Sequence, residues 1–394
     1  MQNIPGAFTI LLVMGLRLST QGQAVSPRPK TAAAPAPLYS ISFERKDPVA
    51  GLDASPAIKL PFDCTADGTV FVTMVPVGGQ MQPPLYAPPP LLLTSVSPSG
   101  QANTFPLDQV TAQLYEVREV DHYASESSVI FLVKAARENR PAKQTYTKQD
   151  GTQGEFTRNT ADRYSYIVLF NRDGEYKKTI ETDVSIEIQH LGVFPSGTFL
   201  AFGYDQKDHS PRLEMLKDDG TLMRTLQISK NDVPESLLGT KDRSGNGPSV
   251  YIAPTQLVPY GHSVLVVQNK TTFPLLEVSE SGEIRTIHPK IPEGMQIEGL
   301  IASDQNLYAR VIPKDEGAIY ELSAQDGTIT RRFELGDGRT ASAVACVHDG
   351  KFLSFEHGEG KLIPLIGTAE PAADVAERSK QNSAGPTSSK SDRH

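Results

Sequence analysis

Between residues 39 and 368 the chain alternates short apolar runs with turns built from Gly, Asp, Ser and Pro. One recurring unit is a small-residue turn followed by an apolar strand, and a second is an apolar strand, a turn ending in Gly and another strand. Six copies of the first unit alternate with six copies of the second, the first starting at residues 67, 127, 196, 262, 305 and 349 and the second at 91, 166, 213, 275, 319 and 361. This pattern is typical of all-β proteins.

The spacing of these units predicts a β-propeller. The base repeat is about 45 residues, and a unit of that length with four strands is one blade. We therefore expect six four-stranded antiparallel blades. The last copy, 361–368, lacks an outer strand, whereas 39–45 is a strand without a blade, so we expect these two segments to pair and to close the ring. A β-sandwich with a second β domain is the alternative, but it would not require twelve turns in strict alternation.

The hairpin units also suggest a family. The stretches YELSAQDGTITRRFEL and VLFNRDGEYKKTIE resemble the hairpins of six-bladed propellers of the NHL-repeat or TolB-like kind. This resemblance covers residues 39–368 and implies an architecture rather than an activity. The chain contains no Trp, which argues against WD-repeat, quinoprotein and Asp-box propellers, whose repeats share a Trp.

The two ends of the chain differ in composition from its middle. Residues 7–16 form an apolar run of the length found in secretory signals, and Gly22-Gln23-Ala24 offers a small-residue cleavage site. We expect a signal peptide at 1–24, a Pro/Ala-rich linker at 25–38 and a disordered tail at 369–394. No other segment is apolar for long enough to span a bilayer, so no transmembrane span is expected. The signal peptide predicts export, to the periplasm or beyond the cell.

Three long insertions are expected to gather on one face, opposite the short turns. They are 78–90, 137–163 and 229–249. The second has six basic residues against four acidic ones and also carries aromatic side chains, a combination that suits protein, peptide or glycan surfaces. The predicted binding residues are Tyr86, Arg137, Arg140, Tyr146, Phe156 and Arg158. Long loops can also be neutral, tolerated extensions.

The predicted innermost strands carry polar residues that would face the central channel. They are Asp63, Glu119, Asp121, His122, His190, Gln256 and Glu298. His122, His190 and Glu298 could hold a divalent cation that activates water. Polar side chains in a water-filled channel need no catalytic role, however, and no nucleophile or phosphate-binding motif occurs in the chain.

Cys64 and Cys346 each lie four residues before a turn glycine, on the first and last innermost strands. Ring closure makes these strands neighbours, so a disulfide could staple the seam of an exported protein. The equivalent positions of the other repeats hold apolar residues, so each Cys could equally be a small buried residue that packs in the core.

Composition narrows the function classes. The formal net charge is -8, so the protein has no general attraction for nucleic acid. We expect a monomeric binding scaffold that works through the face with the long loops and carries no cofactor. The alternative is a metal-assisted hydrolase or lyase with its site at the channel mouth.

Overall fold

The structure is a computed structural model. It describes residues 36–50, 57–75, 92–147, 150–207, 211–227, 254–268, 274–303, 306–312, 318–336, 339–358 and 361–372. Contacts divide the chain into Met1–Pro35 and Ala36–His394, and every described residue belongs to the second unit.

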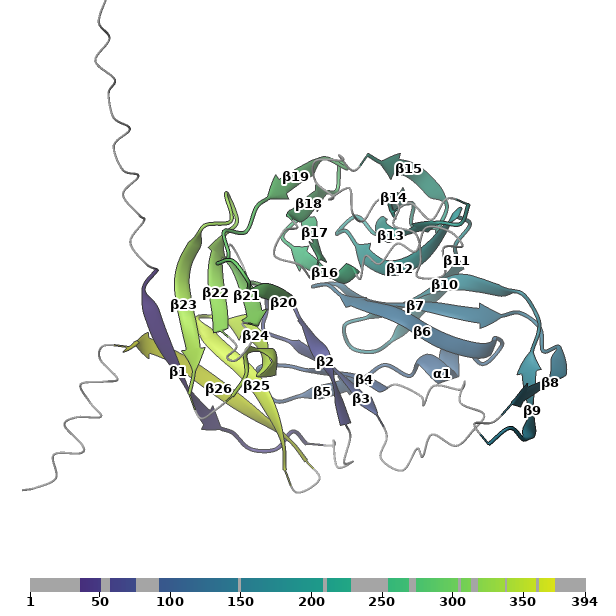
Figure 1. The fold of residues 1–394 in the computed structure, drawn as a ribbon, viewed down its shortest axis with the longest axis horizontal. Helices are drawn as coiled ribbons and strands as arrows, with labels where there is room; N and C mark the ends of the chain where they lie inside the picture. Colours follow the sequence, from purple (N-terminus) through teal and green to yellow (C-terminus); the bar gives the residue numbers. More distant parts are fainter. Residues whose placement is uncertain are drawn as a thin grey trace, which may run out of the picture. The chain divides into compact units, whose positions relative to one another are not determined.

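Four separate four-stranded antiparallel sheets follow one another along the chain (Figure 1). The first contains β2 (Ala57–Cys64), β3 (Val70–Val75), β4 (Leu92–Val96) and β5 (Ala102–Thr104). The second contains β6 (Tyr115–Ala124), β7 (Ser128–Ala136), β10 (Arg163–Asn171) and β11 (Tyr176–Glu181). The third contains β12 (Ile186–Val193), β13 (Phe199–Asp205), β14 (Pro211–Leu216) and β15 (Leu222–Leu226). The fourth contains β16 (Pro254–Tyr260), β17 (Ser263–Gln268), β18 (Leu275–Ser279) and β19 (Ile284–Ile287).

The remaining large sheet has eight strands in the order β20-β21-β22-β23-β1-β26-β25-β24. Its strands are β20 (Gln296–Ser303), β21 (Asn306–Ile312), β22 (Ala318–Ser323), β23 (Ile329–Leu335), β1 (Leu38–Arg45), β26 (Lys361–Pro371), β25 (Lys351–Gly358) and β24 (Val344–His348). Within the described residues there are also two short helices, α1 (Leu107–Val110) and η2 (Ala341–Ala343), and the hairpin described below.

The N-terminal strand pairs with the last strand, as predicted. β1 lies antiparallel to β26, from Tyr39 opposite Pro371 to Arg45 opposite Leu365. Two details differ from the prediction. β1 also pairs in parallel with β23, and β26 continues to Pro371, so a disordered tail from residue 369 is wrong at its start. The reason is that β1 provides hydrogen-bond partners for the backbone of these last residues.

The sheets have a propeller-like arrangement. One edge strand of each four-stranded sheet and both edge strands of the eight-stranded sheet contact one another, in the pairs β2–β6, β6–β12, β12–β16, β16–β20, β20–β24 and β24–β2. Apolar side chains fill the space between neighbouring sheets; Phe71, Phe105, Phe131 and Phe170, for example, are at most 1% exposed and pack ring against ring. The chain is therefore all-β, and burial between radial sheets supplies the main apolar driving force.

One insertion has regular structure of its own. β8 (Pro141–Thr147) and β9 (Gln153–Asn159) form a two-stranded antiparallel sheet between β7 and β10, where the sequence predicts a loop over 137–163. The other predicted loops, 78–90 and 229–249, lie outside the described residues, as does Tyr86. Among the described residues no helix has the length and apolar character needed to cross a membrane.

Candidate functional site

The hairpin β8–β9 is held at its base by one buried amide. A two-stranded ribbon on its own is marginally stable in water. Asn159, 6% exposed, accepts hydrogen bonds through Oδ1 from the backbone N–H groups of Arg140 (2.9 Å) and Ala161 (3.0 Å). Its Nδ2 donates to the carbonyl of Glu138 at 2.8 Å. Asn159 therefore joins both ends of the insertion and orients the ribbon.

Glu116 connects this base to the rest of the second sheet. Its backbone has φ +50°, a left-handed conformation that is uncommon for a residue other than glycine. The Glu116 carboxylate accepts the backbone N–H of Asn159 at 2.9 Å and pairs with Arg163. The register of β6 shifts at this point. The bulge thus aims an acidic side chain at the hairpin base.

One face of the hairpin collects two aromatic rings and a cation. Tyr146 lies opposite Gly154, and a Cβ on Gly154 would lie 2.6 Å from the Tyr146 ring. The ring of Tyr146 therefore lies across β9, where it contacts the Phe156 ring with centroids 5.9 Å apart. Tyr146 remains 41% exposed, and Arg158 follows on the same face, also exposed.

The predicted binding residues therefore fall into two groups. Tyr146, Phe156 and Arg158 share the hairpin face, and Arg158 has no ion-pair partner in the part of the chain that the structure describes. Arg137 pairs with Glu181 and stacks over the Tyr164 ring at 4.4 Å, so it belongs to the sheet beneath. Arg140 pairs with Glu138 at the base of the hairpin.

Most of the polar residues predicted to face a channel contact one another between the sheets. Asp63 accepts from His122 at 3.1 Å and from Gln256 at 3.5 Å. Asp121 lies 2.9 Å from Nδ1 of His190 on the neighbouring sheet. We use the name polar belt for Asp63, Glu119, Asp121, His122, His190 and Gln256. Its contacts link β2, β6, β12 and β16, so these residues join neighbouring and opposite strands.

His122 lies between two carboxylates within this belt. Its Nδ1 lies 2.9 Å from Glu119 and its Nε2 3.1 Å from Asp63. Burial disfavours the charged ring, but the hydrogen bonds to Asp63 and Glu119 outweigh burial and hold the pKa of His122 well above its usual value. A protonated imidazole has no lone pair to offer a metal.

The structure does not bring the predicted metal ligands together. His122 and His190 contact different carboxylates, and Glu298 has a buried Oε2 that no other described residue bonds. Among the described residues, no group of three or more His, Cys, Asp and Glu has a geometry that could hold a metal ion. His122 and His190 thus direct ring nitrogens at carboxylates of the protein itself.

Sequence reasoning missed one buried cation beside the belt. Arg310 is 1% exposed, lies over Gly299 and donates through Nη1 to the Val344 carbonyl at 3.2 Å. Burial lowers the pKa of Arg310, whereas the charges of Glu298 and Asp63 act in the opposite direction. The only sequence signal is an arginine in a strand whose other residues are mostly apolar. Asn159 and Glu116 gave no signal, because their roles depend on the unpredicted hairpin.

A small cavity opens beside Asp63. Tyr123, Gln256 and Leu300 contribute to its lining, and the Tyr123 hydroxyl has no hydrogen-bond partner among the described residues. Burial, together with the charge of Asp63, raises the pKa of Tyr123. The phenol therefore stays protonated and can donate a hydrogen bond.

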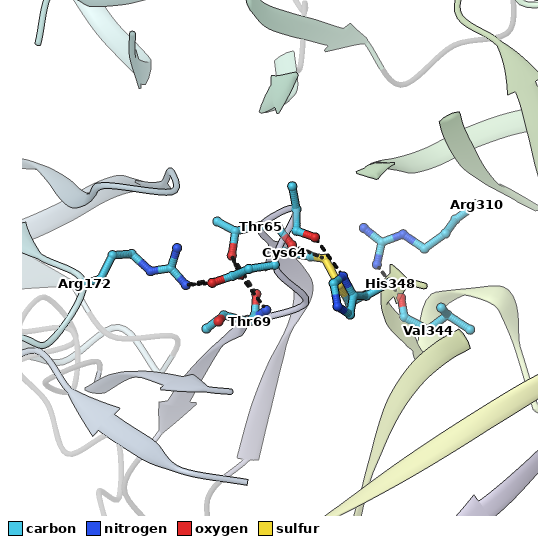
Figure 2. Close-up of a disulfide and its surroundings, with 10 residues drawn as sticks. Cys64, Thr65, Thr69, Arg172, Arg310, Val344 and His348 are labelled. Atoms are coloured by element: carbon cyan, nitrogen blue, oxygen red, sulfur yellow. Dashed lines mark hydrogen bonds and ion pairs between the residues drawn. A yellow bond between two sulfur atoms is a disulfide. The ribbon is translucent and has the colours of Figure 1, made fainter. Parts of the chain in front are cut away.

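The two cysteines are joined. A disulfide links Cys64 on β2 to Cys346 on β24, with Cα atoms 5.4 Å apart, so the packing alternative does not describe these residues (Figure 2). Beside it, Nδ1 of His348 donates to the Ala66 carbonyl at 2.8 Å. Gly68, at φ +80°, leaves room for the His348 ring, which lies where a Cβ would be.

Together, the fold and these sites describe an all-β protein of propeller-like architecture with a projecting hairpin and a polar belt. No protein-family model matches the chain, and no curated protein matches it.

Several solved structures are similar to it in fold. A putative exported protein from Bacteroides fragilis is 8% identical, with a TM-score of 0.42, over 84% of this chain and 99% of that one. A catalytically inactive virginiamycin B lyase from Staphylococcus aureus with quinupristin is 12% identical, with a TM-score of 0.38, over 82% and 99%. A glutaminyl cyclase from Myxococcus xanthus is 10% identical, with a TM-score of 0.33, over 85% and 100%.

Proposed function

We propose that the chain is an exported six-bladed β-propeller that binds a partner through its hairpin face. In this proposal β20–β23 form the fifth blade, and β24, β25, β26 and β1 form the sixth. The eight-stranded sheet supports this division because, among the described strands, its two antiparallel halves are joined in the ladder only by the parallel pairing of β1 with β23. The cyclic contacts of the innermost strands support a closed ring, as in propellers of the NHL-repeat or TolB-like kind.

Export is supported by the apolar run at 7–16 and by the disulfide. Disulfides persist in oxidising compartments such as the periplasm or the extracellular space.

One observation carries the binding role. Tyr146, Phe156 and Arg158 share one face of a hairpin whose base is fixed by Asn159 and Glu116, and Tyr146 and Arg158 are exposed there. Aromatic and arginine side chains are enriched among residues that dominate binding energy, and a preorganised element loses little entropy when it binds. The partner is a protein, a peptide or a glycan.

The alternative, a metal-assisted hydrolase or lyase in the channel, has less support. Both ring nitrogens of His122 face carboxylates, and a protonated His122 would have to lose its proton before it could bind a metal.

Deletion of residues 138–162, with a short Gly-Ser connection, tests the binding role. We expect the variant to fold with its disulfide intact but to lose partner capture in a pull-down. Asp173→Ala, an exposed change in the β10–β11 turn at the other end of the same sheet, is the matched control and should retain capture. Retained capture by the deletion variant would contradict the proposal. Loss of thermal stability on chelation would favour the channel alternative.

A further inference from the structure

No other described strand pairs with either edge of the hairpin, and its hydrogen-bond pattern shows which backbone groups those edges direct outward. Antiparallel partners alternate between hydrogen-bonded and non-hydrogen-bonded pairs. Thr160 donates its backbone N–H to the Arg140 carbonyl at 2.9 Å, whereas the N–H of Asn159 turns away from β8 to Glu116. Counting by twos from these positions, Glu155 and Thr157 direct their N–H and C=O groups away from β8.

The outward backbone groups of β9 are available to a partner near Glu155 and Thr157, but at the base of the hairpin they are already bonded. Neither Glu155 nor Thr157 has a backbone hydrogen bond outside the hairpin ladder within the described residues. At the base, the Glu116 carboxylate already occupies the N–H of Asn159. An added strand would therefore stop at Thr157, which limits the registers available to it.

Side chains at this edge favour one kind of occupant. Because the Tyr146 ring lies across β9 toward Phe156, both rings adjoin the β9 edge rather than the β8 edge. Arg158 is on the same face, is exposed and lacks an ion-pair partner among the described residues. Glu155 projects from the opposite face, where it pairs with Lys143 at 3.4 Å, so it does not oppose an acidic ligand near Arg158.

We propose that the edge of β9, from Gln153 to Thr157, accepts an extended acidic peptide as a third strand. Main-chain hydrogen bonds to Glu155 and Thr157 would supply affinity, and Arg158 would select an acidic side chain on its face. This inference rests on the proposed binding function and names the partner class and the mode of contact.

The first test uses synthetic peptides with the intact protein. The probe is an eight-residue peptide of alternating Thr and Glu. The control is a basic peptide of the same length with Lys in place of Glu. We expect only the acidic peptide to bind, measured by calorimetry. Two further peptides carry N-methyl groups, one on the odd-numbered residues and one on the even-numbered residues. Only one of these two sets directs its backbone N–H groups at β9, so one N-methylated peptide should lose binding and the other should keep it. Failure of the acidic peptide to bind, equal binding of the basic peptide, or equal effects of both N-methyl sets would overturn the proposal.

The second test changes the edge itself. Thr157→Pro removes an outward N–H without removing a ladder hydrogen bond, and it should weaken the acidic peptide about tenfold or more. Thr145→Pro makes the same change on the β8 edge and should alter affinity by less than about twofold. Slow hydrogen exchange of the amides that bond β8 to β9 shows that the hairpin remains formed in each proline variant.

Arg158→Ala should remove the preference for Glu over Lys. If Thr157→Pro binds the peptide as the unaltered protein does, strand addition fails while the binding role, tested by the 138–162 deletion, still stands. If light scattering shows self-association, and Thr157→Pro abolishes it, the occupant of the β9 edge is a second copy of this chain. That result would overturn the proposal of an acidic peptide.

Discussion

His122 shows how a single side chain can link two sheets that follow each other along the chain. Asp63 belongs to the first sheet and Glu119 to the second, and the imidazole between them bonds to both. Removing one member of such a partly buried group leaves uncompensated charge, which costs more than the intact contact contributes.

The charge on His122 gives stability a defined pH dependence. The pKa is raised in the folded state, so the contribution of the protonated ring is complete below about pH 6.5, the usual value for histidine. That contribution is lost as pH rises through the folded-state pKa. His122→Gln should lower the free energy of unfolding by about 3 kcal/mol at pH 6 and by less at higher pH.

Urea unfolding between pH 6 and pH 9 measures this effect. His288→Gln, at an exposed histidine, is the control and should leave the pH profile unchanged. A deficit in His122→Gln that stays constant across the range would contradict the assignment.

Asn159 makes a second residue-scale prediction. Asn159→Ala removes hydrogen bonds to three backbone groups and should cost about 1–3 kcal/mol, because those groups lie at a partly buried base. Faster hydrogen exchange of the Arg140 and Ala161 amides is the expected readout. Thr157→Ala, exposed on the same strand, should leave both rates unchanged; equal rates in Asn159→Ala would rule out the role given to the amide.

At the scale of elements, local patterns predicted the repeated hairpins well. Alternating apolar residues and turn glycines such as Gly174 and Gly220, both at positive φ, specify strand and turn within a few residues. The β8–β9 ribbon was missed because its strands are mostly polar: burial alternates along both of them, but the alternate positions do not hold a run of apolar residues. Parallel pairing of β1 with β23 could not be predicted because nothing in either strand encodes a partner 290 or more residues away.

The double pairing of β1 predicts the result of a truncation. A chain starting at residue 46 would leave the edges of both β23 and β26 unpaired, and open edges favour association between chains. We expect a lower melting temperature and oligomers by light scattering. A chain starting at Ala36 retains every described strand and is the control; a monomeric, equally stable 46–394 chain would show that β1 contributes little.

On the scale of the whole molecule, the disulfide joins positions separated by 282 residues. Cross-links across long loops restrict the unfolded chain, typically by about 2–4 kcal/mol. The paired variant Cys64→Ala with Cys346→Ala should lose stability of that order in denaturant unfolding. Alkylation of denatured, unreduced protein should label no thiol, and two after reduction. Two labelled thiols without reductant would exclude the bond.

The site followed from the sequence less fully than the architecture did. The aromatic and basic residues of the insertion were identified from composition, but which of them share a face depends on a register that Gly154 and Tyr146 set together. The channel histidines were identified as well, but their carboxylate partners depend on how neighbouring sheets meet.

The place of β1 also sets the order in which the protein can be completed. During synthesis this strand emerges early, yet β23 and β26, which flank it, are made near the end. The backbone N–H and C=O groups of β1 therefore have no strand partners until those strands are made. A nascent or prematurely terminated chain exposes these unpaired groups, which proteases and chaperones can recognise. The Cys64–Cys346 disulfide can form only late, because those thiols meet only after almost the whole chain has been made.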